Sequence, residues 1–402
     1  MLYFLLHQIN QIITPNDIKL TMDIKSNKSN KFVSKSISNY LDNTKKLIDN
    51  YLSQWDNMKK YTNPYEFIHT NIPHNNFSIS KLKPISRAFF KLIEIYQTFK
   101  SIPIFIDEPI KTYHLAEGPG GFIEATAYIR NNEYDKYYGI TLIDKSNKNI
   151  PGWKKSEKFL NKNKNVIIEQ GISNDGNLYN PENFLDCYKK HANSMDIITG
   201  DGGFDFSTSY NNQEKMAIRL LFTQMIYAIS LQKKGGSFIL KIFDMFSKPT
   251  IEIIYMLSCF YTNVYITKPN TSRYANSEKY IVCTDFLFDN TNKITNRFYN
   301  ILKVLNSIDY EKYEIIGFLN LPIQLYFKNQ IEEINSIIIQ QQIENILNTI
   351  KLINNYTKNK NEKIDNIKSQ NIQKCINWCI NNNVPYNKYI NSNNIFINDK
   401  NN

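Results

Sequence analysis

The chain has 402 residues, of which 42% are hydrophobic, enough for one large domain with appendages or for two domains. Lys and Arg outnumber Asp and Glu by 48 to 37, and this basic excess favours a polyanionic partner through nonspecific attraction. No apolar run reaches the roughly 18 residues of a membrane-spanning helix. Five scattered cysteines argue against a disulfide framework, so we expect a soluble, intracellular protein without a membrane partner.

Residues 1–75 are predicted to form a helical N-terminal extension. From Ile37 to Met58 apolar residues recur at a spacing close to 3.6, which is typical of an amphipathic helix. Prolines at positions 64 and 73 then interrupt this pattern.

Between residues 76 and 290 helical and strand patterns alternate, and we predict one domain over this range. A helix begins at Pro84 and continues through Phe99. The alternation predicts an α/β fold with a mostly parallel central sheet, covered by helices on both faces. The predicted strands are 111–116, 137–143, 165–169, 195–199, 236–243, 262–267 and 279–284, and the clearest helices between them are 212–233 and 249–260.

Residues 291–402 are predicted to form a helical C-terminal region, with a long helix from Ile331 to Ile353. The last dozen residues are rich in Asn and are predicted to be frayed. Cys375 and Cys379 have helical i, i+4 spacing, but neither a second pair nor a nearby His completes a zinc site. Ordinary packing is the favoured interpretation of this pair, and we predict no metal site.

Glycine is concentrated in the middle of the chain: of the 13 glycines, all but Gly317 lie between Gly118 and Gly236. A glycine-rich turn, 117–121, joins a strand that ends at Ala116 to a helix over 122–129. Such a turn in a doubly wound sheet is where nucleotide-like ligands bind. Its spacing is neither Gly-x-Gly-x-x-Gly nor a phosphate-binding loop, which disfavours dehydrogenases and kinases.

A carboxylate beside this turn suits a ligand with a positively charged amino group, such as S-adenosylmethionine. A purely structural glycine-rich turn is the alternative interpretation. The cofactor-binding residues predicted here are Glu117, Gly118, Pro119, Gly120, Gly121 and Phe122.

Four further segments accompany the turn: 86–92, 196–203, 235–242 and 272–281. At these positions the chain resembles the FtsJ-like family of S-adenosylmethionine-dependent RNA ribose 2′-O-methyltransferases, over residues 84–285. The resemblance implies a Rossmann-like methyltransferase fold at 76–290, flanked by the two helical extensions. It also implies a catalytic tetrad, formed by Lys91, Asp201, Lys241 and Glu278.

The chemistry of this family needs such residue types, because a ribose 2′-hydroxyl is a weak nucleophile that must lose or share its proton. Lys241 is expected to be the base, provided that its amine is neutral, which burial and a neighbouring cation favour. Lys91 supplies the second positive charge, while Asp201 and Glu278 orient the ammonium groups. Each of the four also has an ordinary interpretation, as a solvated, turn-forming or surface residue, but their joint match to the family weakens it.

The chain departs from the bacterial ribosomal branch of the family. His114 stands where that branch has an aspartate, and we expect it to be a satisfied strand residue rather than a catalytic one. Thr141 falls where an acidic residue follows the second strand. We therefore choose Asp175 for the polar contact on the adenine side of the cofactor, and Asp201 is counted among the cofactor residues as well.

The glycine turn, the strand at 139–142 and a long insertion over 144–180 look closer to the mRNA cap branch, found in eukaryotes and large DNA viruses. A basic loop with aromatic residues can follow an RNA backbone and stack a base; a solvated lysine loop around a core tryptophan is the alternative. The residues in question are Lys145, Lys148, Lys154, Lys155, Lys158, Lys162, Lys164, Trp153, Tyr137 and Tyr138.

The first functional hypothesis is therefore an RNA 2′-O-ribose methyltransferase acting near the mRNA cap. The second is the same chemistry on ribosomal or transfer RNA, and the third is a catalytically silent RNA-binding scaffold of the same fold. The intact tetrad argues against the third. The resemblance implies capped RNA as partner and a location in the cytoplasm, the nucleus or the virion of a large DNA virus, with capping or transcription machinery as possible partners of the helical extensions.

Overall fold

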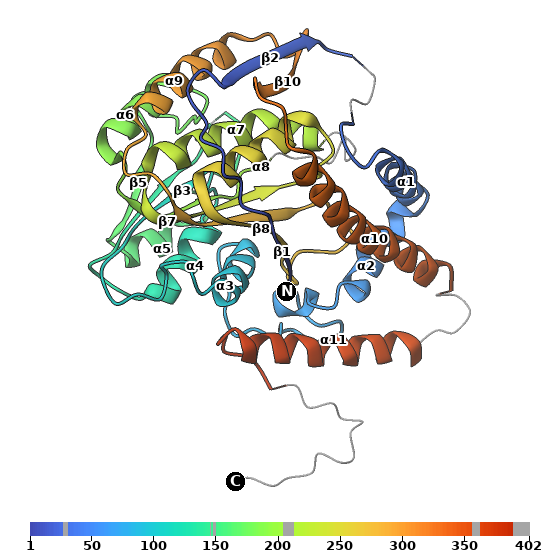
Figure 1. Cartoon of the computed structure of the whole chain (residues 1–402). Helices are drawn as coiled ribbons and strands as arrows, with labels where there is room; N and C mark the ends of the chain where they lie inside the picture. The colour runs from blue at the N-terminus through green and yellow to red at the C-terminus, as the bar shows by residue number, and fades with distance from the viewer. Residues whose placement is uncertain (27–30, 145, 148–149, 204–212, 356–361, 389–402) are drawn as a thin grey trace. The chain divides into compact units, whose positions relative to one another are not determined.

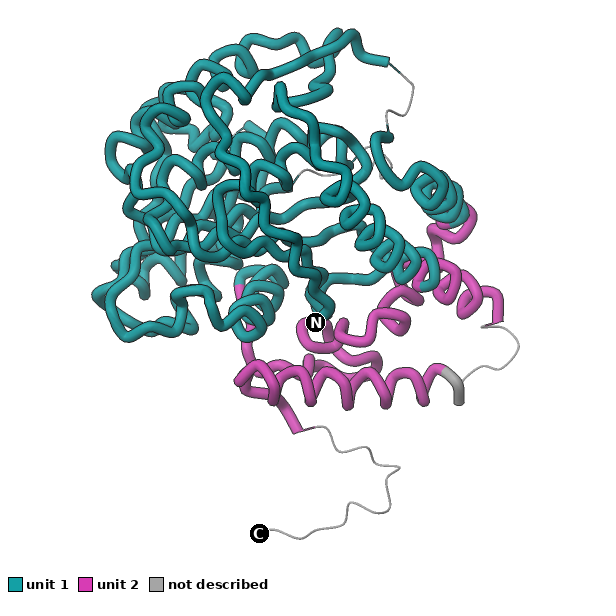
Figure 2. The backbone as a smooth tube through the Cα atoms, viewed as in Figure 1, with its two compact units in different colours: residues 1–47, 85–344 teal, residues 48–84, 345–402 magenta. Residues whose placement is uncertain are grey.

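The chain divides into two compact units, residues 1–47 with 85–344 and residues 48–84 with 345–402 (Figure 2). Each unit combines segments that are far apart in the sequence. The computed structural model describes residues 1–26, 31–144, 146–147, 150–203, 213–355 and 362–388.

The first unit is built on an eight-stranded mixed sheet (Figure 1). Neighbouring strands from β7 to β5 run parallel, whereas β1, β8 and β9 extend the sheet with antiparallel pairing. The predicted α/β class, the mostly parallel sheet and all seven predicted strands are confirmed. In spatial order the strands are β1 (Leu2–Leu5), β8 (Tyr261–Lys268), β9 (Lys279–Phe286), β7 (Gln232–Ile242), β6 (Met195–Gly200), β3 (Lys111–Leu115), β4 (Lys136–Ile140) and β5 (Val166–Glu169).

Helices cover both faces of this sheet, as a parallel sheet requires. In Figure 1, α7 and α8 lie on one face, and α3 and α4 lie on the other. The main hydrophobic core lies under α7 and α8, where side chains such as Met225 and Ile254 are fully buried. The helices of this region are α3 (Ala88–Thr98), α4 (Gly121–Arg130), α5 (Glu157–Lys162), α6 (Pro181–His191), α7 (Gln213–Leu231), α8 (Lys248–Phe260) and α9 (Asn292–Ser307).

The strand order reverses direction between β3 and β6, since β4 and β5 lie on one side of β3 and β6 and β7 lie on the other. Such a switch point opens a crevice at the carboxyl ends of the parallel strands, where open α/β sheets bind their ligands. Because β9 runs antiparallel to β7, its amino end lies at the same edge. Residues that end β3, β6 and β7 or precede β9 are therefore brought together.

The prediction that residues 1–75 are helical is wrong for two segments. Residues 2–5 form β1, which pairs with β8, and β2 (Ile18–Ile24) pairs with β10 (Tyr313–Leu319) in a separate two-stranded sheet. The strand β10 also shows that the helical prediction for 291–402 is wrong over residues 313–319. A short apolar run does not distinguish strand from helix, and the pairing partner decides. The helical prediction is correct for the later part, which forms α1 (Lys35–Lys46), η1 (Leu47–Tyr51) and α2 (Leu52–Thr62).

The second unit is helical. It contains α2, η2 (Glu66–Ile68), the end of α10 (Leu325–Asn355) and α11 (Glu362–Asn381). The Asn371 side chain donates to the Tyr61 carbonyl at 2.7 Å, and the Thr62 and Thr349 hydroxyls are 2.7 Å apart. Segments from both ends of the chain therefore share one unit, and the predicted boundaries at 75 and 290 stay a prediction. The tail predicted to be frayed lies outside the described residues.

All five cysteines are buried, and none is bonded to another. Among the described helices, none is long and apolar enough to cross a membrane.

A buried ion pair closes the amino edge of the sheet, opposite the switch point. The Arg130 guanidinium lies 2.7 Å from the Asp135 carboxylate, and both side chains are almost fully buried. Arg130 also donates to the Glu108 carbonyl at 2.9 Å. We expect Arg130→Met to lower the free energy of unfolding by about 3–5 kcal/mol, because it leaves a buried carboxylate unpaired. Urea denaturation measures this loss, and a loss below about 1 kcal/mol would contradict it.

Candidate active site

The four residues of the predicted tetrad come from four different elements and meet at the carboxyl edge of the sheet. Lys91 lies on α3, Asp201 directly follows β6, Lys241 is the penultimate residue of β7, and Glu278 directly precedes β9. The switch point explains this convergence, because three of these positions are strand ends at the same edge. The structure thus brings the four side chains together, and their catalytic role stays a prediction.

Lys91 and Glu278 form a buried ion pair. The Lys91 Nζ lies 2.7 Å from one carboxylate oxygen of Glu278 and 2.8 Å from the other. Burial lowers the pKa of Lys91, although the charge of Glu278 opposes that shift. Burial alone would raise the pKa of Glu278, but the charges of Lys91 and Lys241 outweigh it and hold this pKa well below its ordinary value. The Glu278 carboxylate is therefore ionised at neutral pH.

Lys241 and Asp201 form the second pair. The Lys241 Nζ donates to the main-chain carbonyl of Asp201 at 2.6 Å and lies 3.3 Å from its Oδ1. Both Asp201 and Lys241 shift the pKa of Lys91, so the two pairs interact electrostatically. Gly203 keeps the space beside Lys241 open, since a Cβ there would lie 3.1 Å from the Lys241 Nζ.

Tyr280 is a site residue that the sequence did not single out. It pairs with Lys241 across β7 and β9, so both side chains are on one face of the sheet. Its hydroxyl donates to Asp201 Oδ1 at 2.9 Å, and its ring lies 5.9 Å from that of Phe122. A signal existed in the sequence: Tyr280 follows Glu278 by two residues in a predicted strand, which puts it on the same face as the tetrad.

We expect Tyr280→Phe to lower the free energy of unfolding by about 1.5–3 kcal/mol, because a hydrogen bond to a charged group is lost. Tyr227→Phe is a matched control, since Tyr227 is equally buried and its hydroxyl bonds to no described residue. Chemical denaturation of both variants tests this expectation. Equal losses in the two variants would show that the bond to Asp201 contributes nothing.

The glycine turn joins β3 to α4 as predicted, and it is closely packed. A Cβ on Gly118 would lie 2.9 Å from the Thr141 hydroxyl, and Gly120 has a φ of +113°, which disfavours any other residue. The Pro119 carbonyl accepts a hydrogen bond from the Ser156 hydroxyl. These contacts hold the turn in one conformation at the end of β3.

Glu117 has one satisfied and one unsatisfied carboxylate oxygen. Its Oε1 accepts hydrogen bonds from the main-chain nitrogens of Phe122 and Ile123, at 2.7 and 2.8 Å, at the start of α4. Its Oε2 is buried and bonds to no described residue. Burial, with help from the charge of Asp201, raises the pKa of Glu117 to about 8. A buried oxygen without a donor fits a cationic ligand group, which would supply the missing donor.

Asp175 lies near the end of β4, where its main-chain carbonyl accepts from the Ile143 nitrogen at 2.7 Å. Its carboxylate accepts hydrogen bonds from within its own loop, from the Ser173 hydroxyl and from the Asn177 nitrogen at 3.0 Å. The Asn183 amide is a further donor at 3.4 Å. The predicted contact with an adenine stays a prediction, and any such contact would add to an acceptor that already has several donors.

His114 is a satisfied strand residue, as expected. It is fully buried, and its ring nitrogens lie 2.9 Å from the Thr112 hydroxyl and 2.8 Å from the Thr199 hydroxyl. Burial lowers its pKa to about 3, so the ring stays neutral.

The aromatic residues near the basic insertion are packing residues. Trp153 packs against Ile123 and Tyr137, and the Tyr137 hydroxyl donates to Asp135 at 2.7 Å. The Tyr138 ring lies 4.5 Å from that of His191. The idea that these rings stack a base is therefore not supported by their positions. Lys145 and Lys148 lie outside the described residues, whereas the remaining insertion lysines, Lys154, Lys155, Lys158, Lys162 and Lys164, are exposed.

In the ranges that the structure describes, no group of three or more His, Cys, Asp or Glu side chains is arranged to hold a metal ion.

The reversal of the strand order and the glycine turn at the end of β3 place this fold in the Rossmann-like α/β class. The chain belongs to the FtsJ-like methyltransferase family, whose family model matches residues 84–286. This agrees with the resemblance found over 84–285.

Two curated relatives illustrate the similarity. Cap-specific mRNA (nucleoside-2'-O-)-methyltransferase 2 of Danio rerio is 29% identical over 266 residues, which cover 60% of this chain and 33% of the relative. Cap-specific mRNA (nucleoside-2'-O-)-methyltransferase 1 of Homo sapiens is 30% identical over 234 residues, covering 55% of this chain and 27% of the relative. The chain thus spans a third or less of the length of these relatives.

Among solved structures, a ribosomal RNA methyltransferase from Plasmodium falciparum is similar with a TM-score of 0.35 and 21% identity. The match covers 50% of this chain and 98% of that one.

Proposed function

We propose that this protein is an S-adenosylmethionine-dependent RNA ribose 2′-O-methyltransferase that acts next to the mRNA cap. The observation that carries the proposal is the meeting of Lys91, Asp201, Lys241 and Glu278 beside the glycine turn. Two amines and two carboxylates in such a buried group suit the transfer of a proton from a sugar hydroxyl.

The glycine turn and Glu117 are proposed to bind the cofactor. S-Adenosylmethionine, when bound, supplies a methyl group on a positively charged sulfur, ready for attack by a nucleophile. The unpaired Glu117 Oε2 suits the ammonium group of this cofactor, and the absence of side chains at Gly118 and Gly120 lets the main chain approach it. Asp201 and Asp175 are the further polar groups proposed for the cofactor.

Lys241 is the proposed base that takes or shares the proton of the 2′-hydroxyl at its Nζ. Asp201 holds this amine through its carbonyl and its carboxylate, and Tyr280 in turn holds Asp201. Lys91 contributes a second cation, oriented by Glu278, which stabilises a developing alkoxide. Most of the rate gain is expected from alignment of the hydroxyl with the methyl group.

The cap-proximal substrate is favoured by the names of the curated relatives, which are cap-specific mRNA methyltransferases. The insertion carries five exposed lysines, and their positive charge suits an RNA backbone. Ribosomal or transfer RNA as substrate and a silent RNA-binding scaffold are the alternatives. Recruitment of capping or transcription machinery by the flanking helices is part of the same proposal.

One assay separates these functions. Labelled S-adenosylmethionine is incubated with the full chain and with capped, uncapped and structured RNAs, and both the incorporation of label into RNA and the binding of each RNA are measured. Label only in capped transcripts supports the cap-proximal function, and label regardless of the cap supports the ribosomal or transfer RNA function. Tight RNA binding without transfer supports the scaffold and contradicts the proposal.

A further inference from the structure

Two buried lysines outside the tetrad donate hydrogen bonds to the main chain at and before Glu278. Lys268 ends β8 and is 3% exposed, and Lys279 begins β9 and is fully buried. Neither side chain belongs to the proposed reaction, and a buried ammonium group needs a strong reason to be kept.

The two ammonium groups hold three successive main-chain carbonyls around Glu278. The Lys268 Nζ donates to the carbonyls of Asn276 and Glu278, at 2.6 and 2.8 Å. The Lys279 Nζ donates to the carbonyl between them, that of Ser277, at 2.9 Å. The main chain before and at Glu278 is thus held by amines from two different strands.

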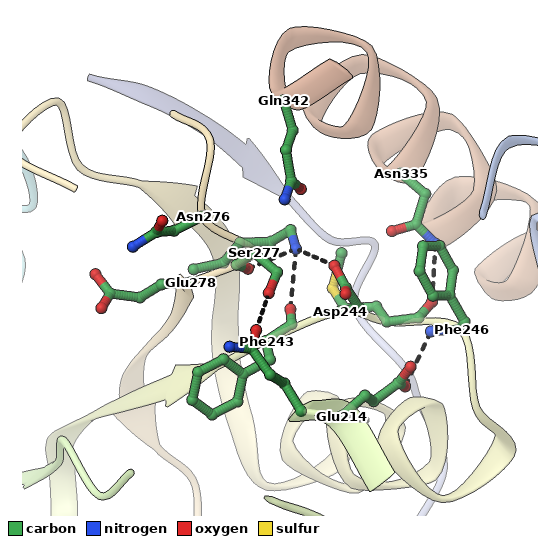
Figure 3. A network of polar contacts seen from close by, with 12 residues as sticks. Glu214, Phe243, Asp244, Phe246, Asn276, Ser277, Glu278, Asn335 and Gln342 are labelled. Carbon is green, nitrogen blue, oxygen red and sulfur yellow. Dashed lines mark hydrogen bonds and ion pairs between the residues drawn. The ribbon is translucent and has the colours of Figure 1, made fainter. Parts of the chain in front are cut away.

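Lys279 also ties this segment to the strand that carries Lys241. Its Nζ donates to the carbonyl of Phe243, two residues beyond Lys241, at 2.9 Å, and Asp244 lies 3.4 Å away. Figure 3 shows Phe243, Asp244 and Ser277 converging in this network, with the Glu278 carboxylate pointing away from it. Asp244 is paired in addition with Lys45 of α1, at 3.2 Å.

The start of the β8–β9 connection, directly after β8, is hydrogen-bonded to α3, the helix that carries Lys91. One turn after Lys91, the Glu94 carboxylate accepts from the main-chain nitrogens of Asn270 and Thr271, at 2.9 and 3.1 Å. The connection is therefore anchored to α3 at its start and to Lys268 and Lys279 at its end, on both sides of the Lys91–Glu278 ion pair.

The stability of the fold alone does not explain why a lysine occupies the buried position 268. In the part of the chain that the structure describes, no carboxylate lies within ion-pair distance of its Nζ, so its acceptors are neutral carbonyls. Burial and the charge of Lys279 lower the pKa of Lys268 to about 7, which records how unfavourable this place is for a charge. Apolar residues usually fill such a site at less cost, and costly local choices cluster at functional sites.

We propose that Lys268 and Lys279 are positioning residues that hold the main chain at Glu278 and thereby keep its carboxylate against Lys91. For catalysis this inference rests on the proposed methyltransferase function. The pairing itself can be measured without any reaction.

The test is a double-mutant cycle on the Lys91–Glu278 pair. Lys91→Met, Glu278→Gln and the double variant are made in the native chain and in Lys268→Met, and denaturation midpoints are measured. The non-additivity of the midpoint shifts reports the coupling between the two side chains. We expect Lys268→Met to reduce this coupling to less than half, and Lys279→Met to act in the same direction.

Arg130→Met is the matched control, because it also removes a buried cation that donates to main-chain carbonyls, but at the opposite edge of the sheet. In this background the coupling should stay as in the native chain. A coupling that Lys268→Met leaves unchanged would overturn the proposal, as would an equal loss in Arg130→Met. If Lys268→Met fails to fold, the cycle is run with Lys268→Gln, whose shorter amide reaches at most one of the two carbonyls.

Failure of this proposal is distinct from failure of the proposed function. A native chain that transfers no methyl group to any RNA would refute the methyltransferase function, whereas the coupling would still report the positioning. Conversely, an active native chain with a coupling independent of Lys268 would refute only the positioning role.

Discussion

Lys241→Met is expected to lower the rate of methyl transfer to capped RNA by about 10²–10⁴-fold, which is the usual contribution of a general base. The methionine side chain is unbranched and one atom shorter than that of lysine, and its thioether does not take up a proton. The affinity for S-adenosylmethionine should change little, since Lys241 itself is not among the proposed cofactor contacts. Single-turnover transfer and equilibrium binding of the cofactor measure the two quantities separately.

A matched control is available on the same strand. Lys233 lies near the start of β7, its side chain is 59% exposed, and its ion pair with Asp196 is far along the strand from Lys241. Lys233→Met should transfer methyl groups at the native rate. If Lys241→Met kept more than about a tenth of the native rate, the proton would have to leave by another route, and the assignment of the base would be wrong.

Much of the site could be predicted because its signals are local. The strands between 111 and 286 are short apolar segments bounded by turns, and the glycine turn directly follows the first of them. The tetrad came from a resemblance of four segments, and the switch-point topology then accounts for the meeting of Asp201, Lys241 and Glu278. Strand ends at one edge are a consequence of the alternation itself.

The parts that could not be predicted depend on pairing between distant segments. Residues 2–5 become a strand because β8 offers a free edge more than 250 residues later in the chain. The pairing of β2 with β10 has the same origin. Lys268 and Lys279 look like ordinary lysines at strand ends, since nothing in their neighbours in the sequence indicates that their acceptors are carbonyls around Glu278.

Glu117→Gln is expected to weaken S-adenosylmethionine binding by about 10–100-fold at neutral pH, in line with a charged hydrogen bond of about 1.5–3 kcal/mol. Glutamine can still accept from the nitrogens of Phe122 and Ile123, so the turn keeps its local bonds. What is lost is the negative charge proposed to pair with the cofactor's ammonium group. Isothermal titration calorimetry measures the change.

The protonation of Glu117 should make both the stability of the protein and its affinity for the cofactor depend on pH. Because burial raises the pKa of Glu117 to about 8, the folded protein holds a proton there that the unfolded chain releases above a pKa of about 4.5. The folded state binds more protons over this range, so the contribution of Glu117 to stability falls as the pH rises from about 4.5 to about 8. Cofactor binding should follow the opposite trend, since the ionised carboxylate is the form that pairs with a cation.

From pH 6 to pH 7.5 the native affinity for S-adenosylmethionine is therefore expected to rise by up to about tenfold per pH unit, whereas that of Glu117→Gln should stay nearly constant. Glu214→Gln is the matched control. Glu214 is also buried, its pKa is raised to about 7 by burial, and its Oε1 accepts from the main-chain nitrogens of Phe246 and Ser247. That variant should change the pH dependence of unfolding but keep the native rise in affinity. A rise in affinity that persists in Glu117→Gln would mean that a group other than Glu117 pairs with the cofactor.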